Sequence, residues 1–141
     1  MRFYIVEPEV AGELGNKTIA DRSVHPPKVK KLHYHFSGWL GDALLESFPS
    51  FIATETARTA IQDAKLSGVH FDSVETSKSE QFDELYPGRS LPRFVWLQVV
   101  GKPGVDDFGL AADHRLVVSE RALNVLKPRG LDHALVDEYN T

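Results

Sequence analysis

The stretch LVVSERALNVLKPRGLDHALVDEY, residues 116–139, predicts a strand, a helix and a second strand in succession. Residues 116–118 are branched and apolar, which favours a short buried strand. Ser119 offers a hydroxyl to the free N–H groups of a new helix, and Glu120 places negative charge at its positive end. The run Lys-Pro-Arg-Gly at 127–130 predicts the end of this helix, because proline cannot continue it and glycine permits the reversal.

Residues 51–75, FIATETARTAIQDAKLSGVHFDSVE, repeat this plan 65 positions earlier. Thr54 aligns with Ser119, and Glu55 aligns with Glu120. The apolar positions that would line one face of each helix also align: Ala57 with Ala122, Ala60 with Val125, and Ile61 with Leu126. The sequence therefore predicts one strand–helix–strand unit that is used twice.

The rest of the chain predicts further short elements. Strands are expected at 2–6, 31–36 and 94–100, and the last of these is apolar at nearly every residue, which places it centrally in a sheet. Helices are expected at 39–47, starting near Asp42, and at 77–86, with a capping box between Ser77 and Glu80. Residues 11–22 are expected to form a loop, and residues 101–113 a glycine-rich acidic loop. The predicted fold is α+β: a single domain over residues 1–141, with a mixed, mainly antiparallel sheet of about six strands and three or four short helices.

Composition narrows the classes of function. A chain of 141 residues with 42% hydrophobic and 26% charged residues is typical of one soluble globular domain. The sequence contains no cysteine, which excludes disulfides, thiolate metal sites and cysteine nucleophiles. It has neither an apolar run near the roughly 20 residues that span a bilayer nor a signal-peptide core in its first ten residues. We therefore expect a cytoplasmic protein without a membrane partner.

The charge balance bears on the kind of partner. The net charge is −4 and the isoelectric point about 5.8, and only the run KVKK at residues 28–31 is a basic stripe. A nucleic-acid-binding protein usually carries a basic balance or a larger basic surface. We therefore expect no nucleic-acid partner and favour a basic protein as the partner of this acidic chain.

Two histidines form the first candidate site. His33 and His35 alternate with apolar residues, so they share the outward face of a half-exposed strand. Such a pair can chelate zinc or another divalent ion, with His25, Asp113 or His114 completing the site. The simpler interpretation is a polar strand face without an ion, and we expect no cofactor. A small metal-dependent hydrolase using His33, His35 and His114 is the alternative function, and it requires all three to meet.

The acidic loop is the second candidate site. His114 has the chemistry of a general base, with Asp113 or Asp107 to orient it, while the simpler interpretation is a solvated acidic loop. The sequence contains no Gly-x-Ser-x-Gly, His-Glu-x-x-His or phosphate-binding glycine motif. We therefore expect that the protein is not an enzyme.

Trp39 lies in a turn between two glycines, where it either anchors a partner or covers the edge of the core.

The segments GWLGDALLESFPSFIATE (38–55) and FGLAADHRLVVSERALNVLKPRG (108–130) resemble bacterial immunity proteins of polymorphic toxin systems. In those small α+β proteins a Trp-x-Gly-Asp segment, a strand that enters a Ser-Glu helix, and an Asp-Phe loop before the last such helix recur. The resemblance extends from about residue 32 to the C-terminus. It leaves the first 25 or so residues unmatched, and the paired cysteines of some relatives are absent here.

The resemblance implies a non-catalytic protein that binds and neutralises a cognate protein toxin. The residues expected to contact the toxin are Asp106, Asp107 and Asp113 in the acidic loop, with Trp39 and Asp42 as a second region. A third hypothesis is a scaffolding protein that associates with itself through an unpaired sheet edge, and the sequence leaves a homodimer open.

Overall fold

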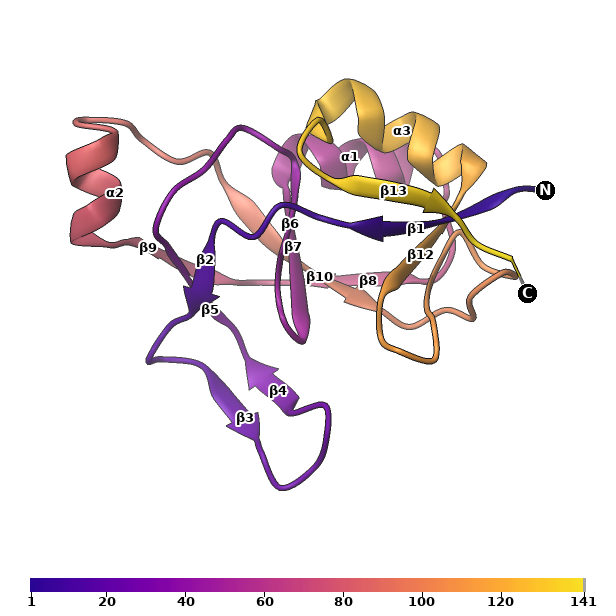
Figure 1. Ribbon diagram of the computed structural model, residues 1–141, viewed down its shortest axis with the longest axis horizontal. Coiled ribbons are helices and arrows are strands. Elements are labelled where there is room, and N and C mark those ends of the chain that lie inside the picture. Colours follow the sequence, from indigo (N-terminus) through magenta and orange to yellow (C-terminus); the bar gives the residue numbers. More distant parts are fainter. Residues whose placement is uncertain (141) are drawn as a thin grey trace.

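The computed structural model describes residues 1–140, and its fold is α+β, as predicted. Three helices occur in this part of the chain: α1 (Glu55–Asp63), α2 (Glu80–Leu85) and α3 (Glu120–Gly130). None of these helices is both long enough and apolar enough to cross a bilayer. Helices α1 and α3 pack against each other at one side of the molecule, and α2 lies at the far end (Figure 1).

Two four-stranded antiparallel sheets form the body of the protein. The first has the order β6 (Leu44–Ser47), β7 (Ser50–Thr54), β10 (Phe94–Val99), β8 (Val69–Asp72). The second has the order β11 (Phe108–Leu110), β12 (Leu116–Ser119), β1 (Phe3–Glu7), β13 (Leu135–Glu138). In each sheet a strand from elsewhere in the chain separates the two strands of one strand–helix–strand unit. The twice-used unit is therefore confirmed, but each copy has its own sheet, and the expected single sheet of six strands was wrong.

The inserted strands β1 and β10 hold equivalent places. Their sequences are alike, RFYIV at residues 2–6 and RFVWL at residues 93–97. The N–H of Glu55 donates to the carbonyl of Arg93 at 2.9 Å, and the N–H of Glu120 donates to the carbonyl of Arg2, also at 2.9 Å. The duplication therefore includes a third strand that lies outside the contiguous strand–helix–strand unit in the sequence.

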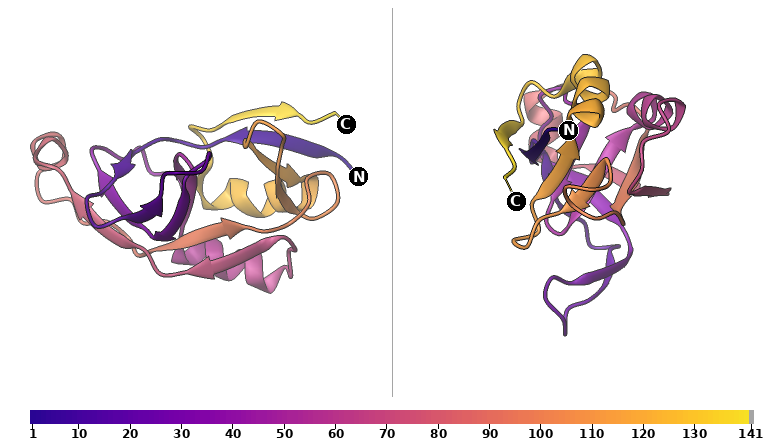
Figure 2. Two further views of the ribbon diagram at one scale, coloured as in Figure 1. Left: turned by 90° about the horizontal axis from the view of Figure 1, so that it is seen from below. Right: turned by 90° about the vertical axis from the view of Figure 1, so that its right-hand side faces the viewer.

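Two smaller sheets complete the fold. In the first, β5 (His33–Phe36) pairs antiparallel with β2 (Gly12–Leu14) and parallel with β9 (Glu75–Lys78). In the second, β3 (Ile19–Asp21) and β4 (Lys28–Lys31) form a hairpin that projects away from the body (Figure 2, right). The expectation of a loop at residues 11–22 was wrong, because β2 and β3 are only three residues long and are stabilised by pairing with β5 and β4.

The cores explain why residues 39–47 do not form the expected helix. Leu44 lies in the core between the two four-stranded sheets, α1 and α3, whereas Leu45 lies in a second core under β5 and α2. Successive residues of a strand point to opposite faces, so both faces of β6 are covered and both leucines are buried. An apolar run of this kind suits a short helix equally well when only the local pattern is known.

The predicted helix starts are confirmed for both units. The N–H of Ala57 donates to the Thr54 hydroxyl at 3.2 Å, and the N–H of Ala122 donates to the Ser119 hydroxyl at 3.0 Å. The second helix ends in the predicted run 127–130, at Gly130, although α3 continues through Pro128. Pro128 has no N–H to donate and its ring crowds the carbonyl four residues earlier, which is consistent with a helix that stops two residues later.

The capping box expected at Ser77 was also wrong. Ser79 caps α2, and its hydroxyl accepts from the N–H of Phe82 at 3.0 Å. Ser77 belongs instead to β9, where it pairs in register with His35 of β5. The parallel pairing of β9 with β5 therefore moves the cap of the helix by two residues, from Ser77 to Ser79.

Candidate functional site

Asp107 connects the segment that follows α1 to the start of α3 in the second strand–helix–strand unit. It precedes β11 directly, and its carboxylate accepts hydrogen bonds from the backbone N–H of Ser67 at 2.8 Å and from the Ser119 hydroxyl at 2.6 Å. The guanidinium of Arg121 donates to the same carboxylate at 2.7 Å. Ser67 follows α1, whereas Ser119 and Arg121 begin α3, so one side chain joins both units.

The carboxylate of Asp107 is ionised in spite of its burial. The residue is 7% exposed, and burial by itself raises the pKa of a carboxyl group. The hydrogen bonds from Arg121, Ser119 and Ser67 outweigh this effect and lower the pKa of Asp107 to about 2. With its oxygens occupied in this way, Asp107 has a structural role.

Asp42 makes the reciprocal connection from the first unit. It precedes β6 and is 2% exposed. Its Oδ2 accepts from the backbone N–H of His133 at 2.8 Å, and its Oδ1 lies 2.9 Å from Nδ1 of the same histidine. His133 lies between α3 and β13, and the N–H of Ala43 also donates to the carbonyl of Gly130 at 2.7 Å. Each helix therefore ends against an aspartate of the other unit.

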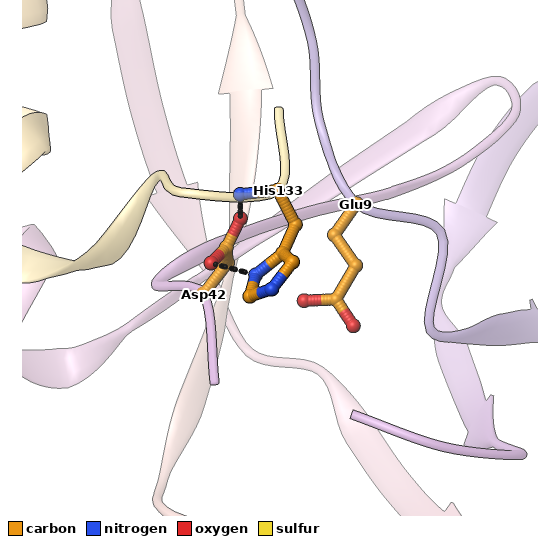
Figure 3. Close-up of side chains that lie close together, drawn as sticks. All are labelled: Glu9, Asp42 and His133. Atoms are coloured by element: carbon orange, nitrogen blue, oxygen red, sulfur yellow. Dashed lines mark hydrogen bonds and ion pairs between the residues drawn. The ribbon is translucent and has the colours of Figure 1, made fainter. Parts of the chain in front are cut away.

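Glu9 lies beside the connection between Asp42 and His133. In the described chain, no equivalent of Glu9 belongs to the connection made by Asp107. The Glu9 side chain enters from the segment after β1 and is 8% exposed. Its Oε2 accepts from the N–H of Leu40 at 2.7 Å, while Oε1 is buried and has no hydrogen-bond partner among residues 1–140. Ligand atoms of Glu9, Asp42 and His133 all lie within 4.8 Å of one another (Figure 3). Within residues 1–140 this is the one group of three or more potential metal ligands so closely spaced.

The charges of the Glu9–Asp42–His133 cluster are unbalanced. Two buried carboxylates share one imidazole, whose pKa is raised chiefly by the hydrogen bond to Asp42, with the charge of Glu9 adding to the effect. The His133 side chain is 42% exposed, so the cluster opens to solvent on the imidazole side. The arrangement can hold a protonated histidine or offer two oxygens and one nitrogen to a cation.

Trp39 lies next to this cluster, where it closes the second core. Its indole N–H donates to the carbonyl of Asp42 at 2.9 Å, and its ring packs against Phe94 at a centroid separation of 5.9 Å. The guanidinium of Arg89 lies over the indole ring, 4.7 Å from its centroid. These contacts match the interpretation in which Trp39 covers the edge of the core, and they leave its ring half-buried.

The expected contact residues differ in their access to a partner. Asp107 and Asp42 are buried and fully engaged inside the protein. Asp113 is exposed and pairs with Arg115 at 2.7 Å, and the partly exposed Asp106 accepts from the N–H of Lys102 at 2.7 Å. Contact with a partner stays a prediction for all five residues, and the buried positions of Asp42 and Asp107 leave Asp106, Asp113 and the half-buried Trp39 as the accessible ones.

The histidine pair on β5 is joined by a serine. Nε2 of His33 and Nδ1 of His35 lie 2.7 and 2.6 Å from the Ser77 hydroxyl. Because Nδ1 of His33 accepts from the N–H of Lys17 at 3.2 Å, its Nε2 carries the proton and donates to Ser77, which in turn donates to His35. Both histidines thus use these nitrogens for internal hydrogen bonds.

His33 is not exposed, contrary to the sequence-based expectation. It is 5% exposed, and burial lowers the pKa of its imidazole. Gly15 packs against the ring so closely that a Cβ there would lie 2.1 Å from Nδ1. The alternation of the strand is correct, but the β2–β3 segment, expected to be a loop, covers its polar face.

The alternative hydrolase required His33, His35 and His114 to meet. His114 instead lies near His25, with ring centroids 6.3 Å apart. The three expected ligands form no close group in the part of the chain that the structure describes. The geometry therefore gives no support to a three-histidine metal site.

Sequence reasoning missed Glu9 and His133. Glu9 stands between a proline and a valine after a strand, and His133 stands in a short connection after a helix. Neither has a local motif, and 91 positions separate His133 from Asp42. One indirect signal was present: the duplication places His133 after α3 much as Ser67 follows α1, and the backbone N–H of each binds an aspartate.

Comparison with models of known protein families finds no match to this chain, and comparison with curated proteins finds no similar sequence. The resemblance to immunity proteins therefore stays a prediction from the sequence.

Proposed function

We propose that this protein is a non-catalytic, cytoplasmic immunity-type protein that binds and neutralises a cognate protein toxin. The proposal includes neither nucleic acid nor a membrane as a partner. Its starting point is the resemblance of residues 38–55 and 108–130 to immunity proteins. The structural observation that supports it best is the separation of charge between the body of the protein and its projecting hairpin.

The projecting hairpin is basic and the body is acidic. We call residues 17–31 the basic arm: Lys17, Arg22, Lys28, Lys30 and Lys31 are all exposed, against one acidic residue, Asp21. The remaining residues contain 11 basic and 19 acidic side chains, which gives them a net charge of −8. The total of −4 thus understates the acidity of the body. Such a surface speeds association with a basic protein, such as a nuclease toxin, and repels phosphate.

The first test is capture of the partner. Tagged protein is purified from the producing cell at low and moderate salt, and bound proteins are identified by mass spectrometry. We expect one stoichiometric partner that stops growth when expressed alone and is tolerated when this protein is co-expressed. Captured proteins that are harmless when expressed alone, or a toxin against which co-expression gives no protection, would contradict the proposal.

The second test locates the interface. The double variant Asp106→Lys with Asp113→Lys changes the charge of the acidic loop without touching the buried Asp107. We expect the association rate with the captured toxin to fall about tenfold at low salt, and the difference to shrink as salt is added. The control is Lys30→Glu with Lys31→Glu on the basic arm, an equal change of opposite sign. Unchanged association in the loop variant would remove the loop from the interface.

Self-association is a separate question. In the described chain β13 pairs on one side only, with β1, and Leu135 on this strand is 65% exposed. Asp137 and Glu138 on the same strand are also exposed. Charged residues on an edge strand oppose pairing with an identical edge. We therefore propose that any homodimer uses another surface, which light scattering of the Leu135→Lys variant tests, because a dimer formed through β13 would dissociate.

A further inference from the structure

We propose that Glu9, Asp42 and His133 bind a divalent transition-metal ion of the Zn²⁺ or Mn²⁺ type. This inference concerns a site that the toxin-binding proposal does not use, and the two stand or fall separately. The cluster joins three segments: the end of β1, the loop before β6, and the connection from α3 to β13. An ion at this point would bind both halves of the duplicated fold at once.

The first observation is the unpaired oxygen of Glu9. Its Oε1 is buried and has no hydrogen-bond partner in the described part of the chain, and the residue is 8% exposed. Leaving a buried carboxylate oxygen without a partner is costly, and buried charges are normally paired or bound to a metal. Two buried carboxylates and a single imidazole leave a deficit of positive charge. A divalent cation bound to a neutral imidazole balances both carboxylates.

The second observation is the spacing of the ligand atoms. Oδ1 of Asp42 and Nδ1 of His133 are 2.9 Å apart. Two donors about 2.1 Å from one ion are about 3.0 Å apart at the right angles of an octahedral ion such as Mn²⁺ and about 3.4 Å apart at the tetrahedral angles typical of Zn²⁺, so this spacing fits octahedral coordination more closely. Figure 3 shows one oxygen of Glu9 turned toward the imidazole, and a Glu9 oxygen lies within 4.8 Å of the other two ligand atoms. The exposed side of His133 leaves room for an ion to enter and for water to complete its coordination.

The third observation is that backbone groups orient both carboxylates. The N–H of Leu40 binds Oε2 of Glu9, and the N–H of His133 binds Oδ2 of Asp42. Each carboxylate is thus held through one oxygen by a backbone N–H, and hydrogen bonds of this kind orient the carboxylates of metal sites. The imidazole favours a transition metal over Ca²⁺ or Mg²⁺, which prefer oxygen ligands alone.

The experiment is titration of chelator-treated full-length protein with Zn²⁺ by calorimetry, and with Mn²⁺ by electron paramagnetic resonance. We expect one bound ion per chain. His133→Gln and Glu9→Gln should each weaken binding at least tenfold, and circular dichroism checks that both remain folded. His133→Gln keeps the backbone N–H that binds Asp42, and its side-chain amide is still a hydrogen-bond donor, so the contact with Asp42 is weakened but not removed. The matched control is His35→Gln, which removes a histidine from the pair on β5 and should leave the affinity unchanged.

A thermal measurement gives a second readout. With Zn²⁺ at a hundredfold excess over its Kd, the melting temperature of the wild-type protein should rise by about 5–10 °C, and that of His133→Gln should not. The proposal is overturned if the wild-type protein takes up no ion saturably. It is equally overturned if His133→Gln and Glu9→Gln bind as tightly as wild type, and loss of binding in His35→Gln would then assign the ion to the histidine pair.

Discussion

Asp107 and Asp42 do the same structural work with different partners. Asp107 is neutralised by Arg121, which is charged at every relevant pH, and its oxygens are all occupied. Asp42 depends on His133, a residue that titrates, and has the carboxylate of Glu9 beside it. The first connection is thus purely structural, whereas the second keeps a free oxygen and an open side. This contrast is why the candidate metal site lies at Asp42.

The Asp107→Asn variant should lower the free energy of unfolding by about 3 kcal/mol. The change leaves Arg121 without its counter-charge and weakens the bonds from Ser67 and Ser119. Urea denaturation measures the difference. Asp106→Asn, at the neighbouring and more exposed position, should stay within about 0.5 kcal/mol of wild type. Equal effects at the two positions would refute the structural role of Asp107.

The stabilisation from Asp107 should depend on pH. Its pKa is about 2 in the folded protein against an ordinary value of 3.8. A carboxyl group with a lowered folded pKa stabilises the protein above its unfolded pKa and loses this effect as pH falls toward the folded pKa. The stability difference between wild type and Asp107→Asn should therefore shrink by about 1 kcal/mol between roughly pH 5 and pH 3. A difference that is constant over this range would contradict the low pKa.

Single residues were the hardest level to predict from the sequence. The caps Thr54 and Ser119 were found because a cap acts on a helix that starts at the next residue. Asp107 and Asp42 were noticed, but as exposed contact residues, because nothing local shows that an aspartate in a loop is buried. Glu9 and His133 were missed because their role arises only when distant segments meet.

The two helix caps give a comparison at the scale of elements. Ser119 is fully buried, accepts from the N–H of Ala122 and donates to Asp107, whereas Thr54 caps α1 without an aspartate partner. Thr54→Ala should therefore cost about 1 kcal/mol and Ser119→Ala about 3 kcal/mol. Denaturant unfolding of both variants checks the order. Similar losses would show that the bond to Asp107 adds nothing to the cap.

Elements were predictable where their signal is local. The strand–helix–strand units and the inner strand at 94–99 follow from caps and apolar runs, and the structure contains them. The strand β6 was taken for a helix because two covered faces give no alternation. Strands β2 and β3 were taken for a loop because their stability comes from pairing with β5 and β4. The arrangement of the two sheets was not predicted, because it depends on where β1 and β10 insert. The sequence similarity between these two strands covers only a short segment.

In each half of the molecule, the sheet includes one strand from outside the strand–helix–strand unit. In the half containing β6, β7, α1 and β8, the additional strand is β10, which follows β8 in the sequence. The half containing β11, β12, α3 and β13 takes β1, which comes from the other end of the chain. The ends of the described chain meet as a result: the N–H of Tyr139 donates to the carbonyl of Phe3 at 2.9 Å, and both labelled ends lie together in Figure 1.

A circular permutant should therefore keep the fold. Joining the ends by a short glycine–serine linker and opening the chain between Gly104 and Val105 makes β11, β12, α3, β13 and β1 contiguous. Val105 is 67% exposed, and exposed loops tolerate new ends. We expect cooperative unfolding in denaturant and a wild-type circular dichroism spectrum. A permutant opened between Gly130 and Leu131, where the chain is buried against the first unit, should lose cooperativity, and the opposite ranking would contradict this arrangement.

The position of β1 also affects how the protein is made. During synthesis β1 leaves the ribosome more than 100 residues before β12 and β13, the strands on either side of it. The sheet of β6, β7, β10 and β8 can form completely during translation, whereas β1 remains unpaired on both edges until β12 and β13 are synthesised. A nascent chain that stalls before residue 116 would thus expose β1, with unpaired backbone groups, to other nascent chains. This exposure ends when β12 and β13 have emerged from the ribosome and pair with β1.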